Sequence, residues 1–164
     1  MASSRNPLQA PVLLGCAALL GYAGLKIHWA LGGAAGIADP PAWRESIDRL
    51  GQAEQLAAFW GTVAIDALGA VVLVALAGTA GTRGGRGLLR RLLRGGSLVA
   101  AVVLGLAAIG GTLVTLGPVL GLWEGREDAF GPIAPGTFLF VYGCFGVYAG
   151  ALARIHHLTR PAGR

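Results

Sequence analysis

Long apolar runs alternate with short polar segments along the 164-residue chain. Each run is long enough to cross about 30 Å of hydrocarbon as a helix that rises about 1.5 Å per residue. The pattern predicts an all-α integral membrane protein, a four-helix antiparallel bundle in one transmembrane domain, residues 1–164, with spans at about 11–31, 55–78, 96–122 and 136–153.

The polar segment after the first run contains the signature of a short amphipathic helix at about residues 40–50. Asp39 is a favourable N-cap, and the proline after it fits the first helical position. Trp43, Ile47 and Leu50 then recur on one face at helical spacing. We expect this helix to lie in the outer membrane interface with Trp43 as its anchor. An ordinary helix outside the membrane is the alternative.

Charged residues are few and unevenly placed. They make up 13% of the chain, against about 25% in soluble domains. Arginines cluster in the loop at residues 82–95 and in the C-terminal tail, whereas residues 32–54 and 124–135 hold more acids than bases. By the positive-inside rule, both termini and the 82–95 loop are cytoplasmic. Residues 88–94 also suit an interfacial helix against anionic lipid. This distribution predicts the lipid bilayer as partner and argues against nucleic acid.

Three ionisable residues lie inside the apolar runs, namely Lys26, His28 and Asp66. Counted from the outer helix ends, they are about 8, 5 and 16 Å deep, where charges are costly and typical of functional sites. Lys26 either pairs with Asp66, which relieves the burial of both charges, or extends outward to the interface or Glu54. His28 lies about 200° around the helix from Lys26, so we interpret it as a hydrogen-bonded structural residue beside Glu54.

Polar and aromatic side chains from all four spans are expected to face one outward-opening zone around Lys26 and Asp66. The candidate ligand-binding residues are Tyr22, Lys26, Trp29, Phe59, Trp60, Thr62, Asp66, Thr112, Thr115 and Tyr142. The tryptophans, which also include Trp43 and Trp123, all fall near the outer interface, where they anchor the protein or line the mouth of a pocket. The alternative is structural, in which one Lys26–Asp66 bridge and threonines bonded to their own backbones lock the bundle.

The sequence indicates no cofactor and no metal site. The two cysteines, Cys16 and Cys144, lie within apolar runs and form no CxxC motif. No spacing typical of metal ligands is present. The glycine-rich segment at residues 84–87 lacks the lysine and the strand–loop–helix context of a phosphate-binding loop.

The segment His28-Trp29-Ala30-Leu31-Gly32-Gly33 ends the first of the four expected spans. In this segment, and in its size and span count, the chain resembles the DUF3995 family of small uncharacterised bacterial membrane proteins, with a specific likeness over the first third. Its abundance of glycine, alanine, leucine and arginine is similar to that of an actinobacterial proteome. The resemblance implies a multi-pass protein of the bacterial inner membrane. It brings no established activity and therefore assigns no catalytic residue.

Three functions fit these features. The main hypothesis is a non-enzymatic membrane protein that binds a lipid, another hydrophobic ligand, or a membrane-protein partner such as a second copy of itself. The first alternative is a membrane-embedded isomerase or cyclase acting on a lipophilic substrate, with Asp66 as acid or base, Lys26 and Tyr142 as further candidate catalytic residues, and His28 assisting. The second alternative is a small oligomeric transporter that uses Asp66 as a proton relay.

Overall fold

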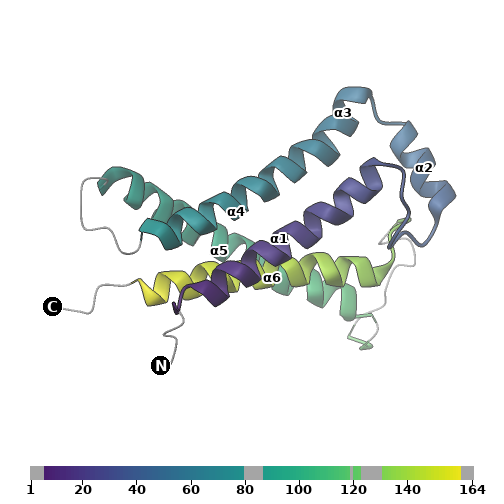
Figure 1. Ribbon diagram of the computed structural model, residues 1–164. Coiled ribbons are helices and arrows are strands. Elements are labelled where there is room, and N and C mark those ends of the chain that lie inside the picture. Colours follow the sequence, from purple (N-terminus) through teal and green to yellow (C-terminus); the bar gives the residue numbers. More distant parts are fainter. Residues whose placement is uncertain (1–5, 80–86, 119, 123–130, 160–164) are drawn as a thin grey trace, which may run out of the picture.

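The computed structural model is all-α and describes residues 6–79, 87–118, 120–122 and 131–159. Within these residues, four helices are long and apolar enough to cross a membrane, at Gln9–Ala30, Gln52–Thr79, Arg91–Leu116 and Pro135–Leu158. The four helices pack together, and consecutive spans run in opposite directions (Figure 1). The chain is therefore a small polytopic membrane protein, and the predicted fold class is confirmed.

The second span is composed of three consecutive elements rather than one regular helix. In chain order the elements are α1 (Gln9–Ala30), α2 (Pro40–Asp48), α3 (Gln52–Leu56), η1 (Ala57–Gly61), α4 (Thr62–Thr79), α5 (Gly87–Leu116) and α6 (Pro135–Leu158). The element η1 is a turn of π-helix that joins α3 to α4 without a break. The helix predicted at residues 40–50 is present as α2, beyond one end of the bundle (Figure 1).

Three helix ends differ from the sequence-based expectation. The helix α5 begins at Gly87, so residues 88–94, for which a separate interfacial helix was expected within the loop at 82–95, are continuous with the helix of the third span. It ends at Leu116 because Pro118 has no backbone N–H with which to continue the hydrogen-bond ladder. The helix α6 continues to Leu158, past the expected end at 153. The expected features at Trp123, at residues 82–86 and in most of the loop at 124–135 lie outside the described residues.

The centre of the bundle is formed by α1 and α6, with α4 on the other side of α1 and α5 on the other side of α6. Leu73, Leu152 and Ile155 are the largest side chains that are fully buried. A Cβ atom at Gly15 would lie 3.0 Å from both the Ala151 Cβ and the Leu73 Cδ1, so the missing side chain lets α1 approach both neighbours closely. Contacts between α4 and α5 are sparse, which leaves these two spans apart over part of their length.

The connection from α1 to α2 is attached to the beginning of α6. The hydroxyl of Thr137 donates a hydrogen bond to the Gly36 carbonyl at 2.7 Å. Gly36 has φ of +74°, a conformation in which a Cβ would also meet the Thr137 side chain. The carboxylate of Asp39 accepts from the Ala42 N–H at 3.1 Å, which is the predicted N-cap. These bonds place α2 over the ends of α1 and η1.

Candidate functional site

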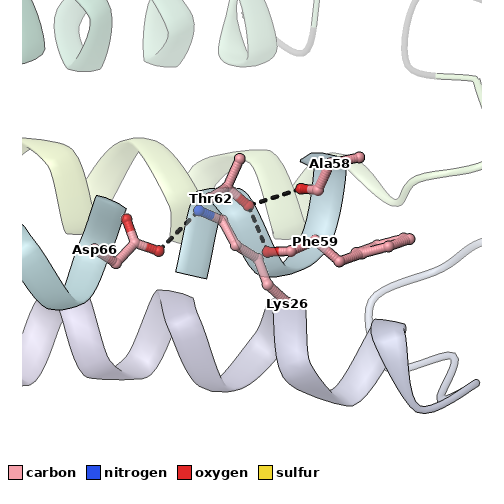
Figure 2. Close-up of polar contacts among 5 residues, drawn as sticks. All are labelled: Lys26, Ala58, Phe59, Thr62 and Asp66. Atoms are coloured by element: carbon pink, nitrogen blue, oxygen red, sulfur yellow. Dashed lines mark hydrogen bonds and ion pairs between the residues drawn. The ribbon is translucent and has the colours of Figure 1, made fainter. Parts of the chain in front are cut away.

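A buried ion pair joins the first span to the second. The Lys26 ammonium on α1 donates to Asp66 Oδ2 on α4 at 2.8 Å, and both side chains are only 9% exposed. Figure 2 shows Lys26 reaching across to the Asp66 carboxylate. The ammonium also lies 3.8 Å from the centre of the Tyr22 ring, a favourable cation–π position. Of the two arrangements that the sequence left open for Lys26, the structure contains the pair with Asp66.

The ion pair leaves hydrogen-bonding capacity unused. Asp66 binds Lys26 through Oδ2, and its Oδ1 has no hydrogen-bond partner in the described part of the chain. An ammonium group carries three N–H donors, and Lys26 uses one of them for its hydrogen bond to the carboxylate. The hydroxyl of Tyr22 likewise has no hydrogen-bond partner among the described residues. The site therefore presents a free donor and a free acceptor side by side.

The π-helical turn η1 shapes the second span just above Asp66. Such a turn takes in one extra residue and frees backbone carbonyls from the α-helical ladder. The Thr62 hydroxyl compensates by donating to the Ala58 carbonyl at 2.7 Å and the Phe59 carbonyl at 2.9 Å (Figure 2). Phe59 is buried, whereas Trp60 is 46% exposed. The turn thus directs one aromatic ring inward and the next outward. The helical periodicity of the sequence does not reveal this π-helical turn.

A cleft with a volume of about 670 Å³ lies between α4 and α5, above a floor formed by α1 and α6. At one end it is lined by Tyr22, Lys26, Thr62 and Asp66. Its walls are apolar and include Ile65, Leu68 and Val72 of α4 together with Leu93, Ala100 and Leu104 of α5. At the other end lie Leu92, Gly96 and Ser97. The cleft is therefore an apolar space with one ionic end.

A second cavity of about 430 Å³ lies beneath α2, and we name it the outer cavity for its place at the α2 end of the bundle. Its aromatic walls are Trp29, Trp43 and Phe59. The Trp43 ring centre lies 5.4 Å from that of Trp29 and 6.4 Å from that of Phe59, so the three rings form one continuous cluster. Lys26 lines both this cavity and the cleft. The ion pair therefore lies where the two spaces meet.

The structure brings together part of the predicted polar zone. Tyr22, Trp29, Phe59 and Thr62 line the cleft or the outer cavity with Lys26 and Asp66. Trp60 instead lines a neighbouring outer pocket with Trp29 and Trp43. These residues of the first and second spans lie around the ion pair, and their role in ligand binding stays a prediction.

The third and fourth spans contribute differently from the prediction. Thr115 is buried and donates to the Gly111 carbonyl of its own helix at 2.8 Å. Neither Thr112 nor Thr115 is among the described residues that line the cleft. Tyr142 lies against Gly111 and lines another pocket, which it shares with Tyr22, Trp29 and Phe138. These groups of the third and fourth spans therefore do not join the cleft. Thr115 lies on the same face of α5 as the cleft-lining Leu104, but about three helical turns farther along, beyond the end of the cleft.

His28 and Glu54 are hydrogen-bonded, but not to each other. The His28 Nε2 accepts from the Ala35 N–H at 3.2 Å, and the Trp29 Nε1 donates to the Ala35 carbonyl at 2.8 Å. Glu54 accepts from the Gly51 N–H at 2.9 Å at the beginning of α3. In place of the expected contact between them, each of these two side chains bonds to a nearby backbone N–H, and the structural role assigned to His28 stays a prediction.

Two polar groups of the cleft escaped the sequence-based prediction. Tyr148 lines its floor and donates to the Gly69 carbonyl on α4 at 3.0 Å. Ser97 lines its inner end and lies 2.8 Å from the His156 Nε2. Tyr148 falls three residues after Phe145, so the two side chains share a face of α6. This spacing in the sequence could have indicated that Tyr148 faces the cleft. Ser97 is a single hydroxyl in an apolar run, and its partner became evident only from the packing of α5 on α6.

No group of three or more metal-ligating side chains is found among the described residues. Cys16 and Cys144 are both free. No family model, curated protein or solved structure matches this chain. The resemblance of its first span to DUF3995 proteins stays a prediction, and the chemistry open to the site follows from its geometry.

Proposed function

We propose that this protein binds a lipophilic ligand in the cleft between α4 and α5, as a membrane protein without catalytic activity. The observation that carries the proposal is the 670 Å³ apolar cleft with the Lys26–Asp66 pair at one end. Small-molecule sites typically have volumes of about 300–1,000 Å³, mostly apolar walls and a few fixed polar groups. A hydrocarbon chain fits such walls, and the ion pair offers hydrogen bonds to its polar end.

The surroundings of the ion pair favour this role over a purely structural one. A pair that served only to lock helices together would be stabilised by close packing on all sides, because buried charges are costly to desolvate. Here the pair borders two cavities and keeps both a donor and an acceptor unused. The pair therefore joins α1 to α4 and at the same time presents polar groups to a ligand.

The bilayer is the source of the ligand in this proposal. Large apolar side chains are exposed along the outer faces of the spans, among them Val71 at 62% and Val103 at 57%. Such surfaces contact lipid chains. We place the protein in a bacterial inner membrane with both termini cytoplasmic and α2 on the outer side. A ligand then enters sideways from the hydrocarbon core, between α4 and α5.

The enzyme hypothesis finds less support in the geometry. It assigned acid–base chemistry to Asp66, with Lys26 and Tyr142 as further candidate catalytic residues and His28 assisting. Tyr142 lines another pocket, and His28 is exposed and bonded to the backbone of Ala35. Of the groups that the hypothesis requires, Lys26 contacts Asp66, whereas Tyr142 and His28 do not line the cleft, so ligand binding is the better conclusion.

A matched pair of glycine variants in α5 tests the proposal. Gly96 lines the cleft, Gly95 does not, and neither has any atom within 4 Å of the position where a Cβ would be. Gly96→Leu adds a side chain that begins in open space and extends into the cleft, whereas Gly95→Leu adds the same side chain outside it. The probe is hexadecane with a mid-chain diazirine, photolysed in nanodiscs that contain the purified protein.

We expect probe attachment to residues of α4 and α5 that line the cleft in the unaltered protein. A leucine at position 96 displaces about two methylene groups of the ligand, worth about 0.8 kcal/mol each, so labelling falls about tenfold. Gly95→Leu is expected to label like the unaltered protein. Equal labelling of the two variants, or attachment spread evenly over the lipid-facing surface, contradicts the proposal.

A further inference from the structure

We propose that the ligand is a neutral long-chain alcohol whose hydroxyl group bridges Lys26 Nζ and Asp66 Oδ1. The inference rests on the proposed function and specifies the chemical class of its ligand. It follows from the hydrogen-bonding capacity of the ion pair, from its charge, and from the polar groups at the two ends of the cleft.

The unused donors and acceptor of the ion pair match a hydroxyl group. Lys26 retains N–H donors, and Asp66 Oδ1 has no hydrogen-bond partner in the described part of the chain. A hydroxyl group both accepts and donates, so one alcohol satisfies both residues. A ketone or an ether only accepts, so it satisfies Lys26 and leaves Asp66 Oδ1 unpaired. Because an unpaired buried polar group is costly, the site favours the alcohol.

The charge of the site favours a neutral headgroup. Lys26 and Asp66 carry opposite charges 2.8 Å apart, so the end of the cleft is neutral overall. A carboxylate or ammonium headgroup would have to leave water and would meet one attractive and one repulsive charge. Its desolvation would be poorly compensated. A neutral headgroup has no such penalty, so charged amphiphiles are disfavoured.

The two ends of the cleft differ in their free polar groups, which sets the direction of the ligand. At the inner end, the Ser97 hydroxyl already interacts with the Arg94 carbonyl at 3.1 Å and with the His156 Nε2 at 2.8 Å. The free polar groups therefore lie at the Lys26 end. From Thr62 to Val72 the wall of α4 extends over about 15 Å, and its lining residues are apolar apart from Thr62 and Asp66. The alcohol is oriented with its hydroxyl toward the outer side and its chain toward the cytoplasmic side.

The test compares probes with the same chain and diazirine but different headgroups, in nanodiscs of phosphatidylcholine. The probes are hexadecanol, hexadecyl methyl ether, hexadecanoate, hexadecylammonium and the headgroup-free hexadecane. We expect hexadecanol to label the cleft about tenfold more than the ether, which lacks the donor for Asp66. The two charged probes are expected to label no better than hexadecane.

A double variant tests whether Lys26 and Asp66 cause the preference for hexadecanol over the ether. In Lys26→Met with Asp66→Asn, the preference for hexadecanol over the ether should fall to about twofold or less, while hexadecane still labels the cleft. The matched control is Thr115→Val, a buried hydroxyl away from the cleft, which should keep the full preference. Because the comparison of probes uses the unaltered protein, it tests the alcohol assignment even where the double variant does not fold.

The outcomes separate this inference from the proposed function. Labelling of the cleft by hexadecane with no gain from the hydroxyl overturns the alcohol assignment and leaves ligand binding intact. Labelling by hexadecanoate or hexadecylammonium equal to that by hexadecanol also overturns it. An absence of cleft labelling by every probe overturns the proposed function itself.

Discussion

The ion pair between Lys26 and Asp66 makes a quantitative prediction about stability. The perturbations are Lys26→Met, Asp66→Asn and the combination of both. Each single change leaves one charge in a site where the side chain is 9% exposed and its partner is gone. The double change removes both charges and leaves two uncharged side chains of similar size.

The geometry sets the expected magnitude. Opposite unit charges 2.8 Å apart attract by about 6 kcal/mol at an effective dielectric constant of about 20. Most of this attraction offsets the desolvation of the two groups. Removal of one partner is therefore expected to lower the free energy of unfolding by about 3–5 kcal/mol, and removal of both by only about 1 kcal/mol. The coupling free energy between the two positions is then several kcal/mol.

The assay is equilibrium unfolding in mixed micelles, by titration with a denaturing detergent and detection of helix content by circular dichroism. A second ion pair in the same chain is the control. Arg49 and Glu45 on α2 form a pair whose side chains are 70% and 68% exposed. Their coupling should be only about 0.3–0.5 kcal/mol, because exposed pairs contribute little.

A result in which the Lys26 and Asp66 changes add independently, with coupling below about 0.5 kcal/mol, would refute the reasoning. It would mean that the two charges are stabilised separately, for example by the outer interface. A large coupling supports a true pair. The labelling experiments described above then decide whether the pair also serves a ligand.

Two further predictions concern the fold and its orientation. Gly36→Ala should lower the free energy of unfolding by about 1–2 kcal/mol, because Gly36 has φ of +74° and a Cβ there meets Thr137. Gly24→Ala, where no atom lies within 4 Å of the added carbon, should be neutral or stabilising in the same detergent titration. For orientation, cysteines introduced at Asp48 and at Arg91, in a background without the two native cysteines, should react with a membrane-impermeant maleimide from the outer side and the cytoplasmic side, respectively. Reaction of both from one side contradicts the four-span topology, and the reverse pattern contradicts the proposed orientation.

The structure also divides the roles within the end of the first span. Lys26 points to α4 and to the cleft. His28 and Trp29 instead bind the backbone of Ala35. His28 accepts from its N–H, and Trp29 donates to its carbonyl. Gly33 lies against the His28 ring, and a Cβ atom at this position would overlap the ring and displace it. Most of this segment therefore builds the turn that leads to α2, and one residue of it reaches the candidate site.

The local features were determined by the sequence itself. Apolar runs long enough to cross a bilayer define the spans, because no other arrangement satisfies their backbone in hydrocarbon. Asp39 and the proline after it begin α2 through interactions within one turn. The depths of Lys26 and Asp66 in the membrane could be estimated from the sequence, because the rise per residue is nearly constant in helices. These depths indicated that the two side chains could pair. Each of these depends on neighbours along the chain.

The composition of the site was decided by tertiary structure. Helical periodicity gives the faces of each span, but it does not say which spans are neighbours or how far each one is rotated. The close approach of α1 to α4 and α6 at Gly15, the extra residue in η1, and the separation of α4 from α5 set those rotations. As a result Tyr142 lies outside the cleft, and Ser97 and Tyr148 line it. Packing between helices is long-range in sequence, and so it places these residues where no local pattern does.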